Sequence, residues 1–449
     1  MRELITKMTV LALLVGFCAV APVFADSNEV TALQGQVQGL TDKLNDIERQ
    51  LRAVESKAGA PSSTYVAPAG SSKGGLMHVA EDINMGGYLD VQWNNNFNQP
   101  RTQGGTNALL RTVPNGTGTG GARSNTGRIF DRYDGSFAVN ASEIYFEKKA
   151  ENAGEAGFRT DIQFGEDAHV VNGNGSGNTD NLVDLQQAYI EYYTPLKIEN
   201  VLDQVKVKAG RFVTLAGLEV IEAPDNWNIS RSYMFGLAIP FTHTGVRTQA
   251  KVMNFFDVYL GLNNGWDLAV DNNAYKTVET GIGYQPINGL TMMHAFYLGN
   301  ENGGPGARSR WLLSNTASYA VTDKLTVAAD VQVANQEKAI AQNISPQIND
   351  YDAQWWGVAG YAKYKLTDKL NMAYRAEFFR DESLLRSAAA GGDPIGDSMF
   401  EQTLTAEYRL TSNLLARAEF RHDMANRDPI FAGREPYQTT IASQLVYSI

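Results

Sequence analysis

The stretch from Trp356 to Asp381 alternates apolar and polar side chains along two arms that flank the short polar turn Thr367-Asp368-Lys369. Side chains of a β-strand point alternately to opposite faces, so each arm has one apolar and one polar face. Each arm holds about 11 residues, the length that a tilted strand needs to cross the hydrocarbon layer of a bilayer. The stretch therefore predicts one complete transmembrane β-hairpin.

The turn sequence of this hairpin recurs along the chain. Tyr364–Leu370 matches Tyr319–Leu325 and Tyr408–Leu414 in order and spacing, and Tyr284–Leu290 is a looser copy. A repeat of strand, short turn, strand and long loop is typical of an up-and-down transmembrane barrel. A blade of a soluble propeller has a similar period but carries four short strands. Two long strands per repeat favour the membrane barrel.

Residues 84–449 contain about sixteen alternating segments, an even number, as a barrel with both termini in the periplasm requires. Short turns alternate with long loops rich in Gly, Asn, Asp and Pro, which is the asymmetry between the two ends of an outer-membrane barrel. About sixteen strands enclose an aqueous lumen. The predicted fold class is all-β, a transmembrane antiparallel up-and-down β-barrel of about 16 strands, preceded by an N-terminal helical coiled coil.

Residues 1–25 have the features of a signal peptide. Arg2 and Lys7 precede an apolar run, and Val23-Phe24-Ala25 has small residues at the two positions that signal peptidase reads. The only cysteine, Cys18, lies in this segment. The mature chain is therefore expected to have no disulfide, no thiolate metal ligand and no covalently attached c-type haem.

A helical segment is predicted over residues 26–57. Apolar residues from Val30 to Val54 are alternately three and four residues apart, which is the pattern of a coiled-coil seam. Self-association of two or three copies in the periplasm is expected, and the alternative is a helix folded against the periplasmic rim of the barrel. Residues 58–83 are rich in Pro, Gly, Ser and Ala, which predicts a flexible linker.

The net charge and the placement of the histidines and oxygen ligands disfavour several classes of function. A formal net charge of −11 disfavours nucleic acid as a partner, and the expected partners are outer-membrane lipid, the barrel-assembly machinery and further copies of the chain. The five histidines are scattered and have no nucleophile motif nearby, so no catalytic residue is assigned. Asn264–Asp267 and Asp271 offer oxygen ligands but lack the EF-hand order. We therefore assign no metal and no cofactor.

The longest loop in the middle of the predicted barrel is Thr214–Pro240. It carries many apolar side chains, which a loop exposed to water does not need. We expect it to fold inward and narrow the channel, and the alternative is packing over the barrel mouth or against a neighbouring protomer. Its charges would then set a transverse field across the constriction. The predicted residues are Glu219, Glu222, Asp225 and Arg231 on the loop and Arg159, Arg211 and Arg247 on the strands.

Arginine and glutamate also recur on the polar parity of the late segments. A ladder of mixed charges lining water explains both signs, and a solute-binding stripe is the alternative. These predicted pore-lining residues are Arg375, Glu377, Arg409 and Arg417.

Two blocks of the sequence resemble a known family. They are AGRFVTLAGLEVIEAPDNWNISRSYMFGLAIPFTHTGVR, from Ala209 to Arg247, and GLNNGWDLAVDNN, from Gly261 to Asn273. Both resemble the family called putative beta-barrel porin-2, or OmpL-like porins, and the likeness extends over the predicted barrel. The resemblance implies an outer-membrane pore and names no cargo.

The leading hypothesis is an outer-membrane porin through which small hydrophilic solutes or ions diffuse passively. A charge-lined, wet lumen lowers the cost of desolvating the solute, and the constriction selects by size and field. One alternative is a barrel that sheathes a partner multihaem cytochrome in electron transfer. The other is a substrate-specific uptake channel.

Overall fold

The computed structural model describes residues 83–99, 125–172, 182–253, 255–301, 308–339, 351–383, 385–386, 398–426 and 435–449. The predicted signal peptide, the predicted coiled coil and the linker up to residue 82 lie outside the described residues, as do parts of several loops.

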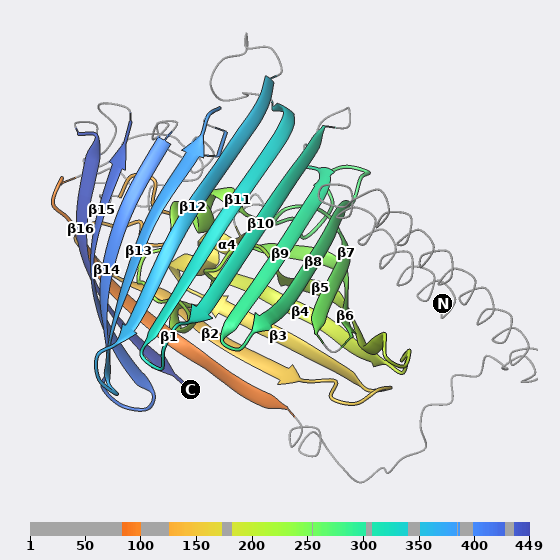
Figure 1. The fold of residues 1–449 in the computed structure, drawn as a ribbon. Coiled ribbons are helices and arrows are strands. Elements are labelled where there is room, and N and C mark those ends of the chain that lie inside the picture. Colours follow the sequence, from red (N-terminus) through yellow and green to blue (C-terminus); the bar gives the residue numbers. More distant parts are fainter. Residues whose placement is uncertain are drawn as a thin grey trace, which may run out of the picture. The chain divides into compact units, whose positions relative to one another are not determined.

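Sixteen β-strands form one closed barrel in which every strand pairs with its neighbours in the chain, and β1 pairs with β16 to close the ring (Figure 1). All the neighbouring pairs are antiparallel, as the register Leu89↔Tyr447 between the first and last strands illustrates. This confirms the predicted up-and-down barrel. The strands are β1 (Asn84–Asn96), β2 (Ser136–Lys148), β3 (Ala156–Phe164), β4 (Val183–Thr194), β5 (Leu202–Val213), β6 (Thr242–Val252), β7 (Phe256–Asn263), β8 (Thr277–Ile287), β9 (Leu290–Asn300), β10 (Ser309–Ala320), β11 (Leu325–Ala339), β12 (Tyr351–Lys365), β13 (Leu370–Asp381), β14 (Ser398–Arg409), β15 (Leu414–Ala425) and β16 (Tyr437–Ser448).

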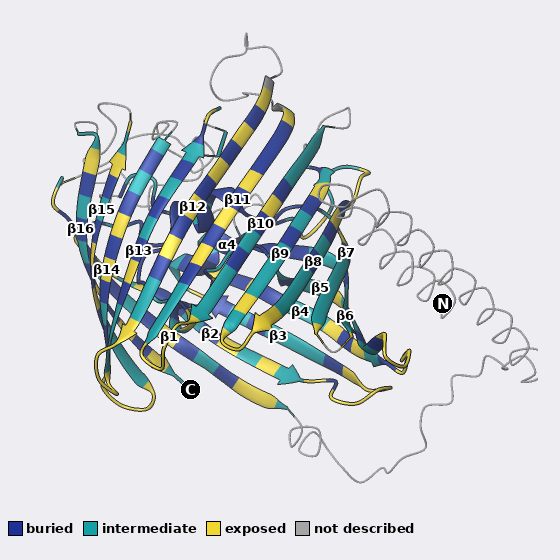
Figure 2. Ribbon diagram, in the orientation of Figure 1, coloured by how far each residue is buried: buried dark blue, intermediate teal, exposed yellow. Residues whose placement is uncertain are grey.

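Burial alternates along the strands (Figure 2). The buried strand positions are mostly polar or small, and large apolar side chains occupy many of the exposed ones. On β1, for example, Asp90 and Gln92 are buried, whereas Leu89 next to Asp90 is exposed. Leaving large apolar side chains in water costs roughly 1.5–3 kcal/mol each. An outer surface of this kind is stable only against lipid, so the described strands form a transmembrane barrel.

The repeated turn sequence has a physical cause in its threonine. The Thr367 hydroxyl accepts hydrogen bonds from the backbone N–H groups of Lys369 at 3.2 Å and Leu370 at 3.0 Å. Thr322 and Thr411 do the same in the turns after β10 and β14. A hydroxyl that satisfies two N–H groups closes the turn, which explains why the same short sequence reappears in these three turns.

Within the described parts of the connections lie three short helices: α4 (Glu166–Asn172), η2 (Ala223–Asp225) and the π-helix η3 (Met234–Ala238). Among the described residues no helix is long and apolar enough to cross a membrane. The barrel also encloses an apolar core, in which Phe235, Leu237 and Phe241 pack against Trp355 and Phe379 of the wall.

Candidate functional site

The chain between β5 and β6, residues 214–241, turns into the barrel; we call it the inserted segment. Its first residues bond to inward-facing side chains on consecutive strands of the wall. Backbone N–H groups of Leu215, Gly217 and Leu218 donate to the Tyr297 hydroxyl on β9 at 2.9 Å, the Ser314 hydroxyl on β10 at 3.0 Å and the Asp330 carboxylate on β11 at 3.0 Å. The segment therefore runs along the inside of the wall.

Buried ion pairs hold the middle of the inserted segment to β13 and β14. Arg375 is fully buried and pairs with Glu219 of the segment at 2.6 Å and with Glu401 at 2.5 Å. It also donates to the Ser230 carbonyl at 2.7 Å. A buried charge is tolerated only when such partners compensate for its lost hydration. Arg375 thus anchors the segment.

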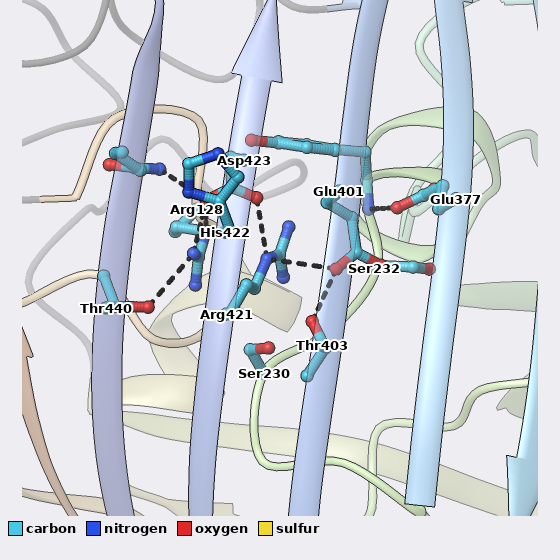
Figure 3. A network of polar contacts seen from close by, with 12 residues as sticks. Arg128, Ser230, Ser232, Glu377, Glu401, Thr403, Arg421, His422, Asp423 and Thr440 are labelled. Carbon is cyan, nitrogen blue, oxygen red and sulfur yellow. Dashed lines mark hydrogen bonds and ion pairs between the residues drawn. The ribbon is translucent and has the colours of Figure 1, made fainter.

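Two arginines of β15 bind the backbone of the inserted segment. Arg417 donates to the carbonyls of Ala223 at 2.9 Å and Asn226 at 2.7 Å, and it pairs with Glu407 at 2.8 Å. Arg421 donates to the Arg231 carbonyl at 2.6 Å. Figure 3 shows Arg421 between Glu401 and Asp423, with ion-pair distances of 3.5 and 2.8 Å.

Glutamates of the wall satisfy N–H groups of the same segment. The Glu377 carboxylate accepts hydrogen bonds from the N–H groups of Tyr233 at 2.7 Å and Met234 at 2.5 Å. These N–H groups lie where η3 begins and have no partner within the helix. The Glu419 carboxylate accepts from Ile229 at 2.6 Å and Ser230 at 3.0 Å. Inward-facing charges of the late strands are therefore bonded to protein, not to open solvent.

Apolar packing completes the attachment. The Trp355 indole N–H donates to the Ala238 carbonyl at 3.0 Å, and Phe235 packs on Phe241 with ring centroids 5.2 Å apart. Phe235 is one of the apolar residues of Thr214–Pro240 from which an inward fold was expected.

A second stretch, residues 125–135 ahead of β2, also reaches the interior and was not foreseen. Arg128 pairs with Asp423 on β15 at 2.5 Å (Figure 3). It also pairs with Asp131 in its own loop. Phe130 packs on Phe235 at 5.5 Å between ring centroids. The sequence signal is an apolar residue among charged ones in a loop assigned to the exterior.

The opposite wall, β2 to β5, keeps charged side chains in partial contact with solvent. Side-chain exposure is 23% for Arg159, 21% for Lys206 and 26% for Lys208, compared with 0% for Arg375. Glu191 lies between the two lysines, 3.3 Å from Lys206 and 3.8 Å from Lys208. Glu191, Lys206 and Lys208 line a cavity of about 160 Å³ together with Glu147, Lys149 and Tyr189.

The tip of the inserted segment, Glu222–Asp225, faces this wall. Glu222 accepts a hydrogen bond from Gln186 of β4 at 2.5 Å, and burial raises the pKa of its carboxyl above the usual value. Asp225 is exposed. On β3, Arg159 binds Asp161 at 2.8 Å. The tip therefore contacts the wall at β4, on the side of the barrel that carries the cationic side chains of β3 and β5.

The structure divides the predicted pore residues into groups. Glu222 and Asp225 lie at the tip and Arg159 lies on β3 bonded to Asp161, whereas Glu219, Arg375, Glu377 and Arg417 hold the inserted segment. Arg231 donates to carbonyls of its own segment. Arg211 pairs with Asp184 at 2.9 Å and Arg247 with Glu279 at 2.5 Å, while Arg409 is exposed at the end of β14. Their part in conduction stays a prediction.

A solved structure with a TM-score above 0.5 supports the fold. The outer membrane channel DcaP of Acinetobacter baumannii is similar with a TM-score of 0.53 at 10% identity, over 82% of this chain and 97% of that one. An anion-selective porin from Comamonas acidovorans aligns with a TM-score of 0.49 at 10% identity, over 82% of this chain and 99% of that one. Pseudomonas putida OprB aligns with a TM-score of 0.49 at 11% identity, over 83% and 96%.

No curated protein matches the chain. A family described as "Putative beta-barrel porin-2, OmpL-like" matches residues 82–449, which include the whole barrel. Membership of a porin family agrees with the expectation that the chain is not an enzyme. The chain belongs to this family and is a porin of the bacterial outer membrane.

Proposed function

We propose that the inserted segment is the constriction of this porin and that small hydrophilic solutes or ions diffuse past its tip, along the wall of β3 to β5. The supporting observation is the asymmetry of the lumen. Charges on β13 to β15 are buried against the segment, whereas Arg159, Lys206 and Lys208 remain partly exposed beside a cavity. A hydrated solute can therefore bind polar side chains on the side of β3 and β5.

The charges across this path form a transverse field. Glu222 and Asp225 lie on the tip, and Arg159, Lys206 and Lys208 lie on the wall. Such a field orients dipolar solutes and replaces part of the hydration that ions lose in a narrow pore. Because ion pairs and backbone hydrogen bonds fix the segment, the constriction is formed before a solute arrives.

The inserted segment counts against the alternative in which the barrel encloses a haem protein. Aromatic and aliphatic side chains of the segment fill the part of the lumen beside β9 to β13. A partner domain would have to displace this core and the buried ion pairs that attach it. Saturable flux of one solute class would instead favour the substrate-specific channel.

Cysteine substitution offers a direct test, because the chain has a single cysteine and it lies in the predicted signal peptide. The purified barrel with Asp225→Cys is placed in a planar bilayer and treated with a charged thiol reagent. Modification at the tip should reduce the conductance of each step. The matched control is Glu155→Cys, an exposed residue of the turn between β2 and β3. A fully modified Asp225→Cys channel with unchanged conductance would place the constriction elsewhere.

We further propose that residues 26–57 associate as a coiled coil in the periplasm and gather two or three copies of the porin. The support is the unbroken heptad spacing of apolar residues in the sequence. The barrel-assembly machinery is the expected partner during insertion, with lipid around the finished barrel. Native mass measurement of the full chain and of a chain lacking residues 26–57 tests the association, since loss of the oligomer only in the shortened chain is expected.

A further inference from the structure

Three carboxylates from three separate elements meet where the tip of the inserted segment reaches the wall. They belong to Glu143 of β2, Asp161 of β3 and Glu222 of the tip, and one oxygen from each lies within 4.8 Å of the other two. Like charges at this separation repel one another unless a cation or a proton lies among them.

The cationic partners in the structure do not balance this cluster. Asp161 accepts from Arg159 at 2.8 Å and from Gln187 at 2.6 Å. Glu222 accepts from the neutral amide of Gln186. Glu143 is 2% exposed, and its Oε2 atom has no hydrogen-bond partner among the described residues. One arginine therefore serves three carboxylates, so the cluster carries a net negative charge of two when all three are ionised.

Neutral oxygens next to the cluster are also without partners. The side-chain carbonyl of Gln186 is buried and accepts no hydrogen bond from the described residues, although its amide nitrogen is bonded to Glu222. Gln163 lies directly opposite Glu143 in the pairing of β2 with β3, and its buried side-chain carbonyl oxygen also accepts no hydrogen bond from the described residues. Buried acceptors normally have a donor or a cation as partner. Two independent amides thus add oxygen ligands to the carboxylates.

We propose that Glu143, Asp161 and Glu222 bind a divalent cation, for which Ca²⁺ is the best match. Calcium takes 6–8 oxygen ligands in flexible geometry and accepts both carboxylates and amide carbonyls. The cluster offers no histidine or cysteine, which zinc and copper sites use. A charge of two on the ion matches the unbalanced charge of the cluster.

The bound ion would join the tip of the inserted segment to β2 and β3. It would also cancel the negative charge of Glu222 and leave the cationic wall of Arg159, Lys206 and Lys208 dominant. Calcium would therefore shift the selectivity of the pore toward anions. This effect on selectivity rests on the proposed constriction, whereas binding itself does not.

Terbium luminescence measures the binding on the purified full-length protein in detergent, with Ca²⁺ as the competitor. Tyr88 lies directly opposite Glu143 in the pairing of β1 with β2, so it can sensitise an ion held there. We expect sensitised emission that Ca²⁺ displaces, with a dissociation constant on the order of 10⁻⁴ to 10⁻³ M. Glu222→Gln, a change outside the strands, should weaken binding roughly tenfold or more.

Asp257→Asn is the matched control, because Asp257 is a partly exposed carboxylate on β7 away from the cluster. It should leave terbium binding unchanged. No displaceable emission in the wild type, or equal affinity in the wild type and Glu222→Gln, would overturn the site and would leave a shared proton as the explanation of the cluster.

Reversal potentials with and without Ca²⁺ separate the site from the proposed constriction. A calcium-dependent shift in the wild type that is absent in Glu222→Gln supports both. Binding that depends on Glu222 without any shift in reversal potential supports the cation site and overturns the constriction.

Discussion

Arg375 of β13 and Glu219 of the inserted segment form an ion pair of 2.6 Å in which the arginine is fully buried. Arg375→Met would leave Glu219 and Glu401 as buried charges without their shared partner. Removing one member of a buried pair costs about 3–5 kcal/mol. We expect a lower urea midpoint for unfolding from lipid vesicles and noisier single-channel currents, because the segment loses its anchor.

Arg380→Met on the same strand is the control for this change. Arg380 pairs with Glu382, and both side chains are largely exposed, so the pair contributes at most about 1 kcal/mol. Equal destabilisation by the two substitutions would mean that Arg375 does not anchor the inserted segment.

The lysines of β5 are expected to favour anions in the pore. The double variant Lys206→Gln, Lys208→Gln removes two charges from the cavity wall. Partly exposed charges contribute about 0.5 kcal/mol each, or about 1 kcal/mol for the two lysines, so the anion-to-cation permeability ratio should fall roughly fivefold. Reversal potentials across a salt gradient give this ratio. Asp225→Asn should shift it in the opposite direction.

Lys197→Gln provides the comparison for the lysine variants, because Lys197 lies in the exposed turn between β4 and β5. Its reversal potential should equal that of the wild type. If the β5 double variant also matched the wild type, the conduction path would not pass the β5 wall.

The prediction of the fold from sequence succeeded because two local patterns carried it. Side-chain alternation defines the inner and outer parity of each strand, and the threonine of the repeated turn bonds within its own turn, so neither depends on distant residues. Parity does not say what an inner side chain touches. Arg375 and Arg159 both face inward, yet Arg375 is covered by the inserted segment, whereas 23% of the Arg159 side chain stays exposed.

Contacts between distant segments could not be predicted from the sequence, for a related reason. Arg128 meets Asp423 across 295 positions of the chain, and no local period links them. The same is true of Glu143, Asp161 and Glu222, which come from two strands and a loop. Apolar residues in the loop at Thr214–Pro240 were a usable signal, because a loop in water has no use for them.

A pH dependence of stability is expected from Asp167 in α4. Burial raises the pKa of this carboxyl well above its ordinary value, and the nearby Asp90 adds to the effect. A carboxyl with a raised pKa in the folded state stabilises the protein fully below its unfolded pKa of about 3.9. That contribution is lost as the pH rises through the folded pKa, because the folded state must then bury a charge.

The neutral variant Asp167→Asn should therefore be more stable than the wild type at pH 8 and should unfold with a flatter pH profile. Each unit of pKa displacement corresponds to about 1.4 kcal/mol. Asp323→Asn in an exposed turn should keep the wild-type profile. Parallel urea midpoints for wild type and Asp167→Asn between pH 4 and pH 8 would show that Asp167 is not protonated in the folded protein.

Alternate side chains of the strands face outward, so the cost of placing an arginine there depends on its depth in the bilayer. Leu404 of β14 and Leu410 in the turn after it are both outward-facing, with exposures of 46% and 45%. Arginine near the bilayer midplane of a barrel costs roughly 2–4 kcal/mol, and arginine near the interface costs about 0–1 kcal/mol. Leu404→Arg should therefore lower the free energy of unfolding from lipid vesicles more than Leu410→Arg does. Equal losses in vesicles would contradict a lipid-facing wall, since water on the outside makes depth irrelevant.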